Sequence, residues 1–190
     1  SRELQKKIDD KKGESLTLNN MGAVALLTAN YIEAIDLFKQ SLELRELILD
    51  TSGIASSYGN LGIVYKHQEK YQLAKNCYFK ALNLHQIRKN KYGENVVLIN
   101  LGAIYEKEGQ LDSALYYHLK SQRLAEEREN PFLLSTILNN IGVVHFRKGE
   151  TDSAISFCLK SFELAKQIGA AVEARLAASK SRVVSIRLPE

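Results

Sequence analysis

The sequence predicts an all-α protein, a right-handed superhelical solenoid built from helix-turn-helix repeats. The first reason is internal repetition. The phrase NNMGAV at residues 19–24 returns as GNLGIV, INLGAI and NNIGVV at residues 59–64, 99–104 and 139–144. The second reason is that apolar residues within each 40-residue interval follow helical spacing in two separate stretches. A fixed period of this kind across four copies is typical of solenoids, in which each repeat stacks on its neighbours.

The repeat boundaries follow from aligning the chain on this period. We expect a single solenoid over residues 1–190, with four full repeats at 14–53, 54–93, 94–133 and 134–173. Residues 1–13 match the end of a preceding repeat. Residues 174–190 match a first helix in which Lys180, Ser181 and Arg182 replace the repeated phrase. We interpret this last stretch as a capping helix and tail, because the end of a solenoid needs a polar outer side. The alternative is a tail that leads into another domain.

Each repeat is expected to contain two helices. In the first copy, Leu18, Met21 and Val24 mark the apolar face of the first helix, and Ile35 and Phe38 mark that of the second. The stretches DTSG (50–53), KYG (91–93) and NPF (130–132) interrupt the pattern between repeats. Side chains that commonly cap helices stand near the starts of the second helices, namely Asn30, Gln110, Asp112, Thr151 and Asp152.

The repeated glycine predicts a close contact between helices. Glycine inside a helix costs about 1 kcal/mol relative to alanine, so a mid-helix glycine kept in four copies implies that a side chain would be in the way. These glycines are Gly22, Gly62, Gly102 and Gly142. We expect them to face the alanines that recur at the same interval in the second helices, namely Ala34, Ala74, Ala114 and Ala154.

The pattern resembles the tetratricopeptide repeat, whose signature is W-x2-L-G-x2-Y followed by A-x3-F and a proline over about 34 residues. Leu61-Gly62-x2-Tyr65 and Leu101-Gly102-x2-Tyr105 match its first part, and Ala34-x3-Phe38 matches its second. The chain departs from the signature in lacking the tryptophan and the final proline. Its longer period resembles a long-helix subclass that includes kinesin light chains and repeat arrays of bacterial signalling proteins. The resemblance implies a helical solenoid that binds proteins or peptides.

No motif for catalysis or metal binding stands out. The histidines His67, His85, His118 and His145 are never three or four residues apart, so no helix offers a local pair of metal ligands. Glycine-rich phosphate loops, H-E-x-x-H and G-x-S-x-G do not occur. We therefore expect a protein that is not an enzyme and needs no cofactor or metal. His118 stands in the column of Phe38, where we expect a packed aromatic substitute.

Charge and composition narrow the class of partner. Residues 54–93 carry seven basic residues and one acidic residue, whereas the whole chain has a net charge of only +4. This is one basic repeat and not the continuous basic stripe of a nucleic-acid binder, so we expect no nucleic-acid partner. No apolar run is long enough for a membrane span, so we expect no membrane partner. We interpret Cys77 and Cys158 as small buried side chains and not as a disulfide. Free cysteines favour a reducing, cytoplasmic compartment.

An asparagine precedes the glycine by two residues in every copy. The four residues are Asn20, Asn60, Asn100 and Asn140. Asparagine is unfavourable inside helices, so its recurrence calls for a reason. If the first helices line the concave surface, these amides can hold the main chain of an extended peptide, because each has both a donor and an acceptor. The alternative is that they bond to a neighbouring repeat and order the stack.

A partly basic row follows one helical turn further along the same helices. It contains Leu27, His67, Lys107 and Arg147, with Lys66 beside it. Inside a groove this row would favour an acidic segment or a terminal carboxylate. The alternative is that these residues are ordinary solvated charges at the rim.

These observations predict a protein- or peptide-binding scaffold, or the sensing module of a larger signalling or regulatory protein, that binds in its concave groove. The alternative is self-association into a homodimer through an exposed helix face or an uncapped end, without a ligand in the groove. A phosphatase-like peptide receptor would need a further helical bundle, which these residues do not contain.

Overall fold

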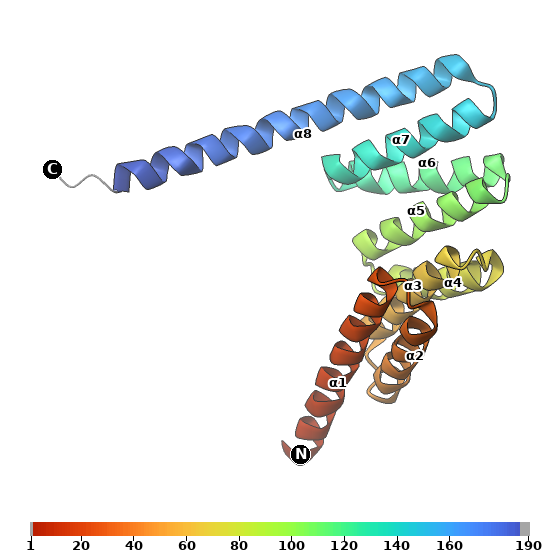
Figure 1. Cartoon of the computed structure of the whole chain (residues 1–190), viewed down its shortest axis with the longest axis vertical. Coiled ribbons are helices and arrows are strands. Elements are labelled where there is room, and N and C mark those ends of the chain that lie inside the picture. Colours follow the sequence, from red (N-terminus) through yellow and green to blue (C-terminus); the bar gives the residue numbers. More distant parts are fainter. Residues whose placement is uncertain (1, 187–190) are drawn as a thin grey trace. The chain divides into compact units, whose positions relative to one another are not determined.

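The computed structural model describes the backbone of residues 2–186 and the side chains of residues 3–4 and 6–172. This part of the chain is all α-helical and contains no strand. Figure 1 shows its helices in chain order. They are α1 (Arg2–Leu27), α2 (Tyr31–Leu47), α3 (Thr51–His67), α4 (Tyr71–Ile87), α5 (Lys91–Lys107), α6 (Leu111–Glu127), α7 (Pro131–Arg147) and α8 (Thr151–Ile186). The prediction of an all-α fold made of helix pairs is confirmed.

A residue in the left-handed conformation ends each of the first seven helices. These residues lie 20 apart and are Ala29, Leu49, Glu69, Lys89, Gly109, Glu129 and Gly149, with φ between 49° and 79°. The turn closes the helix end with a backbone bond from the following residue to a carbonyl five residues earlier, as from Asn30 N to Ala25 O at 2.8 Å. The 40-residue sequence period is therefore two nearly identical 20-residue helix-and-turn units.

Side-chain caps occur at the first helices of the repeats, not at the second as the sequence suggested. Asp50, Asn90 and Asn130 each accept a hydrogen bond from a backbone N–H three residues later, at 3.1 Å. Asn30 and Gln110, which precede second helices, make no such bond. Asn30 instead donates from its amide to the Glu33 carboxylate. The stretches that interrupt the sequence pattern thus mark capped helix starts.

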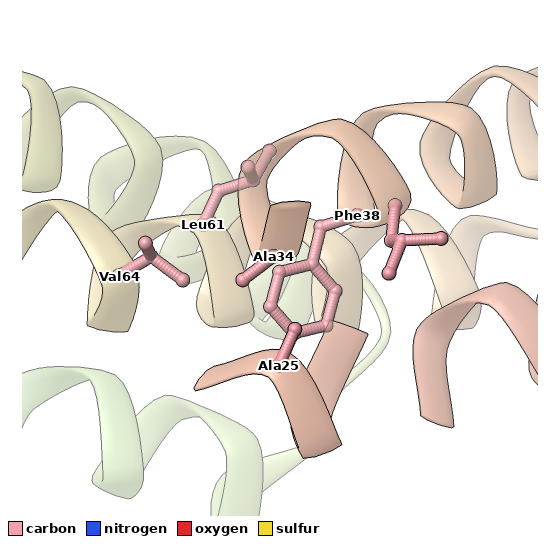
Figure 2. Close-up of a cluster of buried hydrophobic side chains, with 6 residues drawn as sticks. Ala25, Ala34, Phe38, Leu61 and Val64 are labelled. Carbon is pink, nitrogen blue, oxygen red and sulfur yellow. The ribbon is translucent and has the colours of Figure 1, made fainter. Parts of the chain in front are cut away.

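Helices pack mainly against their neighbours in the chain. In the first compact unit, residues 1–108, each helix from α1 to α5 contacts the next, and α3 also contacts α1 and α5. In the second unit, residues 109–190, α6 packs on α7 and α7 on α8. One cluster of the first unit combines Ala25 of α1, Ala34, Leu37 and Phe38 of α2, and Leu61 and Val64 of α3. Figure 2 shows the Phe38 ring directed toward Ala25, with Ala34 beside it.

Three glycines of the repeated phrase, Gly22, Gly62 and Gly142, make room mainly for a side chain other than that of the recurrent alanine. A Cβ on Gly22 would lie 2.8 Å from the Phe38 ring, and one on Gly62 would lie 2.6 Å from the Tyr78 ring. A Cβ on Gly142 would lie 2.6 Å from the Cys158 sulfur. The predicted close contact exists, but its partner stands four residues beyond the alanine. One helical turn separates the two positions, so both lie on the same face and spacing alone could not choose between them.

The two ends differ from the predicted boundaries. Helix α1 continues without a break across residues 13 and 14, and α8 continues across residues 173 and 174. In α8, Gly169 stands 20 residues after Gly149, but Ala170 then occupies the cap position and has no side-chain oxygen to begin a new helix. Residues 174–186 of the predicted capping segment are thus helical and continuous with α8, and residues 187–190 lie outside the described residues.

Two further properties concern the described residues only. None of their helices has both the length and the apolar character needed to cross a bilayer. Both cysteines are free thiols, Cys77 half-buried and Cys158 exposed, so the expectation of a buried Cys158 is wrong. Phe38 and Tyr78 occupy the position of Cys158 in earlier repeats and are 0% and 1% exposed. Each of them is covered by the next helix of its unit.

Candidate functional site

Two of the four predicted asparagines lie on one pocket. Asn60 on α3 and Asn100 on α5 are both half-buried and line a cavity of about 250 Å³ among α3, α4 and α5. The lining residues are Ala55, Ser56, Gly59, Asn60, Ile63, Tyr78, His85, Asn90, Tyr92, Gly93, Val96, Val97 and Asn100. Asn20 is exposed and lines a different pocket on α1, and Asn140 is half-buried on α7 of the second unit.

The amides of Asn60 and Asn100 already have protein partners. Asn60 Nδ2 donates to Asn19 Oδ1 of α1 at 2.8 Å. Asn100 Nδ2 donates to the Val96 carbonyl of its own helix at 3.0 Å, and Asn100 Oδ1 accepts from Lys66 Nζ at 2.6 Å. Each asparagine therefore has one contact to the preceding first helix, which agrees with the stack-ordering interpretation. Contact with a ligand stays a prediction.

Lys66 is not a rim charge. Its side chain is half-buried and reaches from α3 to Asn100 on α5, and this burial lowers the pKa of its ammonium group. A cation that has lost part of its hydration is short of negative partners, since its hydrogen-bond acceptor is a neutral amide oxygen. Lys66 therefore gives the region around Asn100 an electrostatic preference for anions.

The other members of the predicted basic row are exposed. His67 stacks on Tyr31 of α2 with 6.0 Å between ring centroids and an interplanar angle of 15°. Lys107 is exposed at the end of α5, and Arg147 is exposed at the end of α7 in the second unit. The structure brings Lys66, Asn60 and Asn100 together in one region. A single site formed by the whole basic row stays a prediction.

Tyr78 lies beneath this pocket and was missed by sequence reasoning. It is 1% exposed and lines the cavity, and its ring packs on Gly62. Its hydroxyl oxygen is buried and has no hydrogen-bond partner. Burial raises the pKa of Tyr78, so the hydroxyl keeps its proton and can only serve as a neutral donor or acceptor. An unpaired buried hydroxyl costs about 1–3 kcal/mol.

His85 lines the same pocket, and its pKa is lowered. Burial, and secondly the charge of Arg88, lower its pKa, while Glu94 opposes them. Asn90 Oδ1 accepts from the Gly93 N–H at 3.1 Å, which turns Asn90 Nδ2 toward His85 Nδ1 at 3.3 Å. In the tautomer whose Nδ1 accepts from this amide, the ring proton is on Nε2.

Other polar groups form ion pairs and not reactive clusters. Lys75 of α4 bonds both oxygens of Glu108 at 2.9 and 3.0 Å, and in the second unit Lys148 reaches Asp112 at 2.9 Å. Among the described side chains, no three of the His, Cys, Asp and Glu type gather as metal ligands would. His118 is fully buried as expected of a packed aromatic substitute, and neither of its ring nitrogens has a hydrogen-bond partner.

The fold and the site together define a helical repeat protein with a pocket among α3, α4 and α5 that is lined by both apolar and polar residues. The family model for the tetratricopeptide repeat matches residues 13–87 and 93–167. The chain therefore belongs to the tetratricopeptide-repeat family, as the sequence pattern predicted. A comparison with curated protein sequences gives no match.

Several solved structures are similar to the chain. Aspartyl phosphate phosphatase F from Bacillus subtilis has a TM-score of 0.80 at 16% identity, covering 84% of this chain and 42% of that one. BtubC from P. vanneervenii has a TM-score of 0.75 at 17% identity, covering 82% and 64%. A Rap protein complexed with competence and sporulation factor has a TM-score of 0.71 at 17% identity, covering 81% and 43%. The chain spans less than two thirds of each of these relatives, and at such identities the likeness shows the fold alone.

Proposed function

We propose that the chain is a binding module that holds an extended segment of a partner protein along the first helices of its repeats. The observation that carries this proposal is the shared pocket of Asn60 and Asn100, on α3 and α5. Their amides can exchange hydrogen bonds with peptide groups whatever the partner's side chains are. The proposed role is that of a scaffold or a sensing segment within a larger signalling or regulatory protein.

The spacing of the helices suits an extended ligand. Packed helices lie about 8–10 Å apart. An extended chain advances about 3.3 Å per residue and covers that distance in about three residues. Amides on successive first helices would therefore meet every third peptide unit or so. On binding, a partner carbonyl would accept a hydrogen bond from the Asn60 Nδ2 group, which in the free protein donates to Asn19.

Similar structures give this proposal further support. One is a Rap protein complexed with competence and sporulation factor, and another is a Rap conjugation gene regulator in complex with the Phr* peptide, at a TM-score of 0.66 and 19% identity. Those complexes belong to those proteins. For this chain, the excess of basic residues between positions 54 and 93 favours an acidic partner whose binding weakens as salt rises.

The test is a peptide-array screen followed by affinity measurements on asparagine variants. We expect Asn20→Ala and Asn60→Ala each to weaken the best peptides about fivefold, since one neutral hydrogen bond contributes about 1 kcal/mol. Asn83→Ala is the matched control, because Asn83 is exposed on α4, a second helix. If the Asn60→Ala protein binds peptides normally but melts earlier, the amides only order the stack and the proposal fails.

Self-association is a second candidate, and one observation favours it. Met21 and Val24 on α1 are 50% and 61% exposed, whereas the equivalent residues Leu61 and Val64 on α3 are 4% and 0% exposed. The α3 pair is covered by α2, the second helix of the preceding repeat. A second copy of the chain could cover α1 in the same way.

Sedimentation equilibrium of the parent and of Met21→Glu with Val24→Glu would test this candidate. We expect the parent to form dimers or larger head-to-tail species and the variant to be monomeric. A parent that stays monomeric at high micromolar concentration would exclude the candidate.

A further inference from the structure

One donor of the pocket among α3, α4 and α5 lacks an acceptor. The Tyr78 hydroxyl is buried without a hydrogen-bond partner, and His85 lines the same pocket with its Nδ1 at 3.3 Å from Asn90 Nδ2. At the edge, Lys66 donates to Asn100, which also lines the cavity. A group that enters this pocket and only accepts hydrogen bonds would satisfy donors that the protein leaves unpaired or weakly paired.

We infer that this pocket receives one acidic side chain, aspartate or glutamate, of the bound partner segment, and that the Tyr78 hydroxyl donates a hydrogen bond to its carboxylate. The inference rests on the proposed peptide-binding function and adds the place and chemistry of one specific contact. A carboxylate is the side-chain group that accepts hydrogen bonds without donating any. Asn100 then shares Lys66 with the incoming anion.

The size of the pocket indicates a side chain and not a whole small-molecule ligand. Its volume of about 250 Å³ falls below the roughly 300–1,000 Å³ of cavities that enclose drug-sized ligands. The rest of the partner segment that carries this side chain would lie outside the pocket, along Asn20 and the other polar groups of the first helices.

The charges around the pocket agree with an anionic occupant. Lys66 is half-buried at its edge, and Arg88 acts on His85 from the end of α4. Glu94 is the acidic group next to His85, but it does not line the pocket and is engaged by Gln86 at 3.0 Å and Lys91 at 3.4 Å. The balance of free charge at the cavity is therefore positive.

The packing of Tyr78 does not explain its hydroxyl, because the equivalent residue of the preceding repeat has none. The equivalent residue Phe38 fills the same place against Gly22 with a ring that carries no polar atom. Phenylalanine at position 78 would fill the space against Gly62 equally well and leave no buried hydroxyl unpaired. The tyrosine oxygen is thus available for a partner that is not part of the chain.

The experiment uses small probes, so that it does not depend on the binding of an extended peptide by the repeated asparagines. Titrations followed by amide NMR spectra would compare N-acetyl-glutamate N-methylamide and the aspartate analogue with the neutral N-acetyl-glutamine N-methylamide. We expect saturable shifts at the Gly59, Gly93 and Val96 amides with roughly millimolar dissociation constants for the acidic probes. The glutamine probe should bind about tenfold more weakly, because hydrogen bonds to charged groups are the stronger ones.

Three variants identify the groups responsible. Tyr78→Phe should weaken the glutamate probe about tenfold and leave the melting temperature equal or higher, whereas Tyr58→Phe, on the same helix pair but outside the pocket, should change neither. Lys66→Met should weaken the glutamate probe but not the glutamine probe. A purely structural role for Tyr78 would lower the melting temperature without affecting the probes.

Several results would overturn the inference. They are equal affinity for the glutamate and glutamine probes, unchanged binding by Tyr78→Phe, or no saturable shift at about ten times the expected dissociation constant. Tighter binding of N-acetyl-alanine, which has a terminal carboxylate, would assign the pocket to a chain end and not to a side chain. Failure here leaves the proposed function standing if Asn20→Ala and Asn60→Ala still weaken array peptides. If those variants have no effect while the probes bind, the proposed function fails and the pocket remains.

Discussion

Lys66 of α3 donates a hydrogen bond to Asn100 of α5, with 2.6 Å between Nζ and Oδ1. The bond joins the first helices of two successive repeats and is made by a half-buried cation to a neutral acceptor. Burial without a negative partner is why the pKa of Lys66 is lowered. The interface between repeats therefore contains a charge that the protein itself does not neutralise.

Replacing the neutral acceptor by a carboxylate tests this relationship. We expect Asn100→Asp to raise the free energy of unfolding at neutral pH by about 1 kcal/mol, because a carboxylate adds charge–charge attraction to a bond whose donor is already charged. Chemical denaturation of both proteins would measure the change, and Asn140→Asp on α7 serves as the control for helix propensity. A loss of stability in Asn100→Asp alone would show that Lys66 is already well solvated.

The contact between Gly62 and Tyr78 predicts opposite effects of one substitution at two glycines of α3. Gly62→Ala should cost about 1–3 kcal/mol, because its Cβ would lie 2.6 Å from the Tyr78 ring. Gly59→Ala should stabilise the protein by about 0.5–1 kcal/mol, since no atom lies within 4 Å of its Cβ and alanine is the better helix former. Equal effects in denaturant titrations would contradict the packing described for Gly62.

His118 makes the stability of the protein sensitive to acid. Burial lowers its pKa from the ordinary 6.5 to about 4. Between these values the unfolded chain binds the proton more readily than the folded one, so the stability present above pH 6.5 is lost as the pH falls toward 4. The loss from this one residue amounts to about 3 kcal/mol.

His118→Phe should remove that part of the acid sensitivity and also stabilise the protein at pH 7, because both imidazole nitrogens are buried without partners. Denaturation midpoints at pH 7 and pH 4.5 would measure both effects, with His67→Gln at an exposed site as the control. Parallel pH profiles for the parent and His118→Phe would refute the assignment.

The left-handed turns predict that glycine can stabilise the chain where it replaces a non-glycine residue. Glu69 has a φ of 58° and an exposed side chain, so Glu69→Gly should raise the free energy of unfolding by about 0.5–1 kcal/mol. Gly149, with a φ of 79°, should give the reverse on Gly149→Ala. Glu43→Gly inside α2 is the control and should lose stability. Loss of stability in Glu69→Gly would show that the turn does not strain its residue.

Repetition in the sequence was sufficient to predict the family, the helix pairs and the presence of a close contact at the glycines. It could not reveal the 20-residue period of the turns. A left-handed residue can be expected from sequence where it is glycine, as at Gly109 and Gly149, but not where it is Ala29 or Glu69. Spacing also could not decide whether an alanine or an aromatic ring faces each glycine, since both lie on the same side of the second helix.

The sequence identified the asparagines of the candidate site but not their hydrogen-bond partners. Asn60 recurs at a fixed place in the sequence, yet its bond to Asn19 depends on how two first helices pack. Lys66 was expected beside the basic row of the groove, with an exposed rim position as the alternative, and sequence position alone could not show its burial. The sequence contained one signal for Tyr78, because the equivalent residue Phe38 has no hydroxyl. That hydroxyl is significant only because it is buried without a hydrogen-bond partner, which the folded structure alone shows.

The packing of each helix on its chain neighbours has a consequence for how the protein folds. Within each compact unit the contacts join segments that are close in sequence, mostly through turns of three residues. Such local topologies have low contact order and fold in microseconds to milliseconds, because little loop entropy is lost before contacts form. Folding can begin at any well-packed hairpin and spread to its neighbours. Within the first unit, hydrogen exchange should then be slow in α3 and α4, each of which packs on the helix before it and the helix after it.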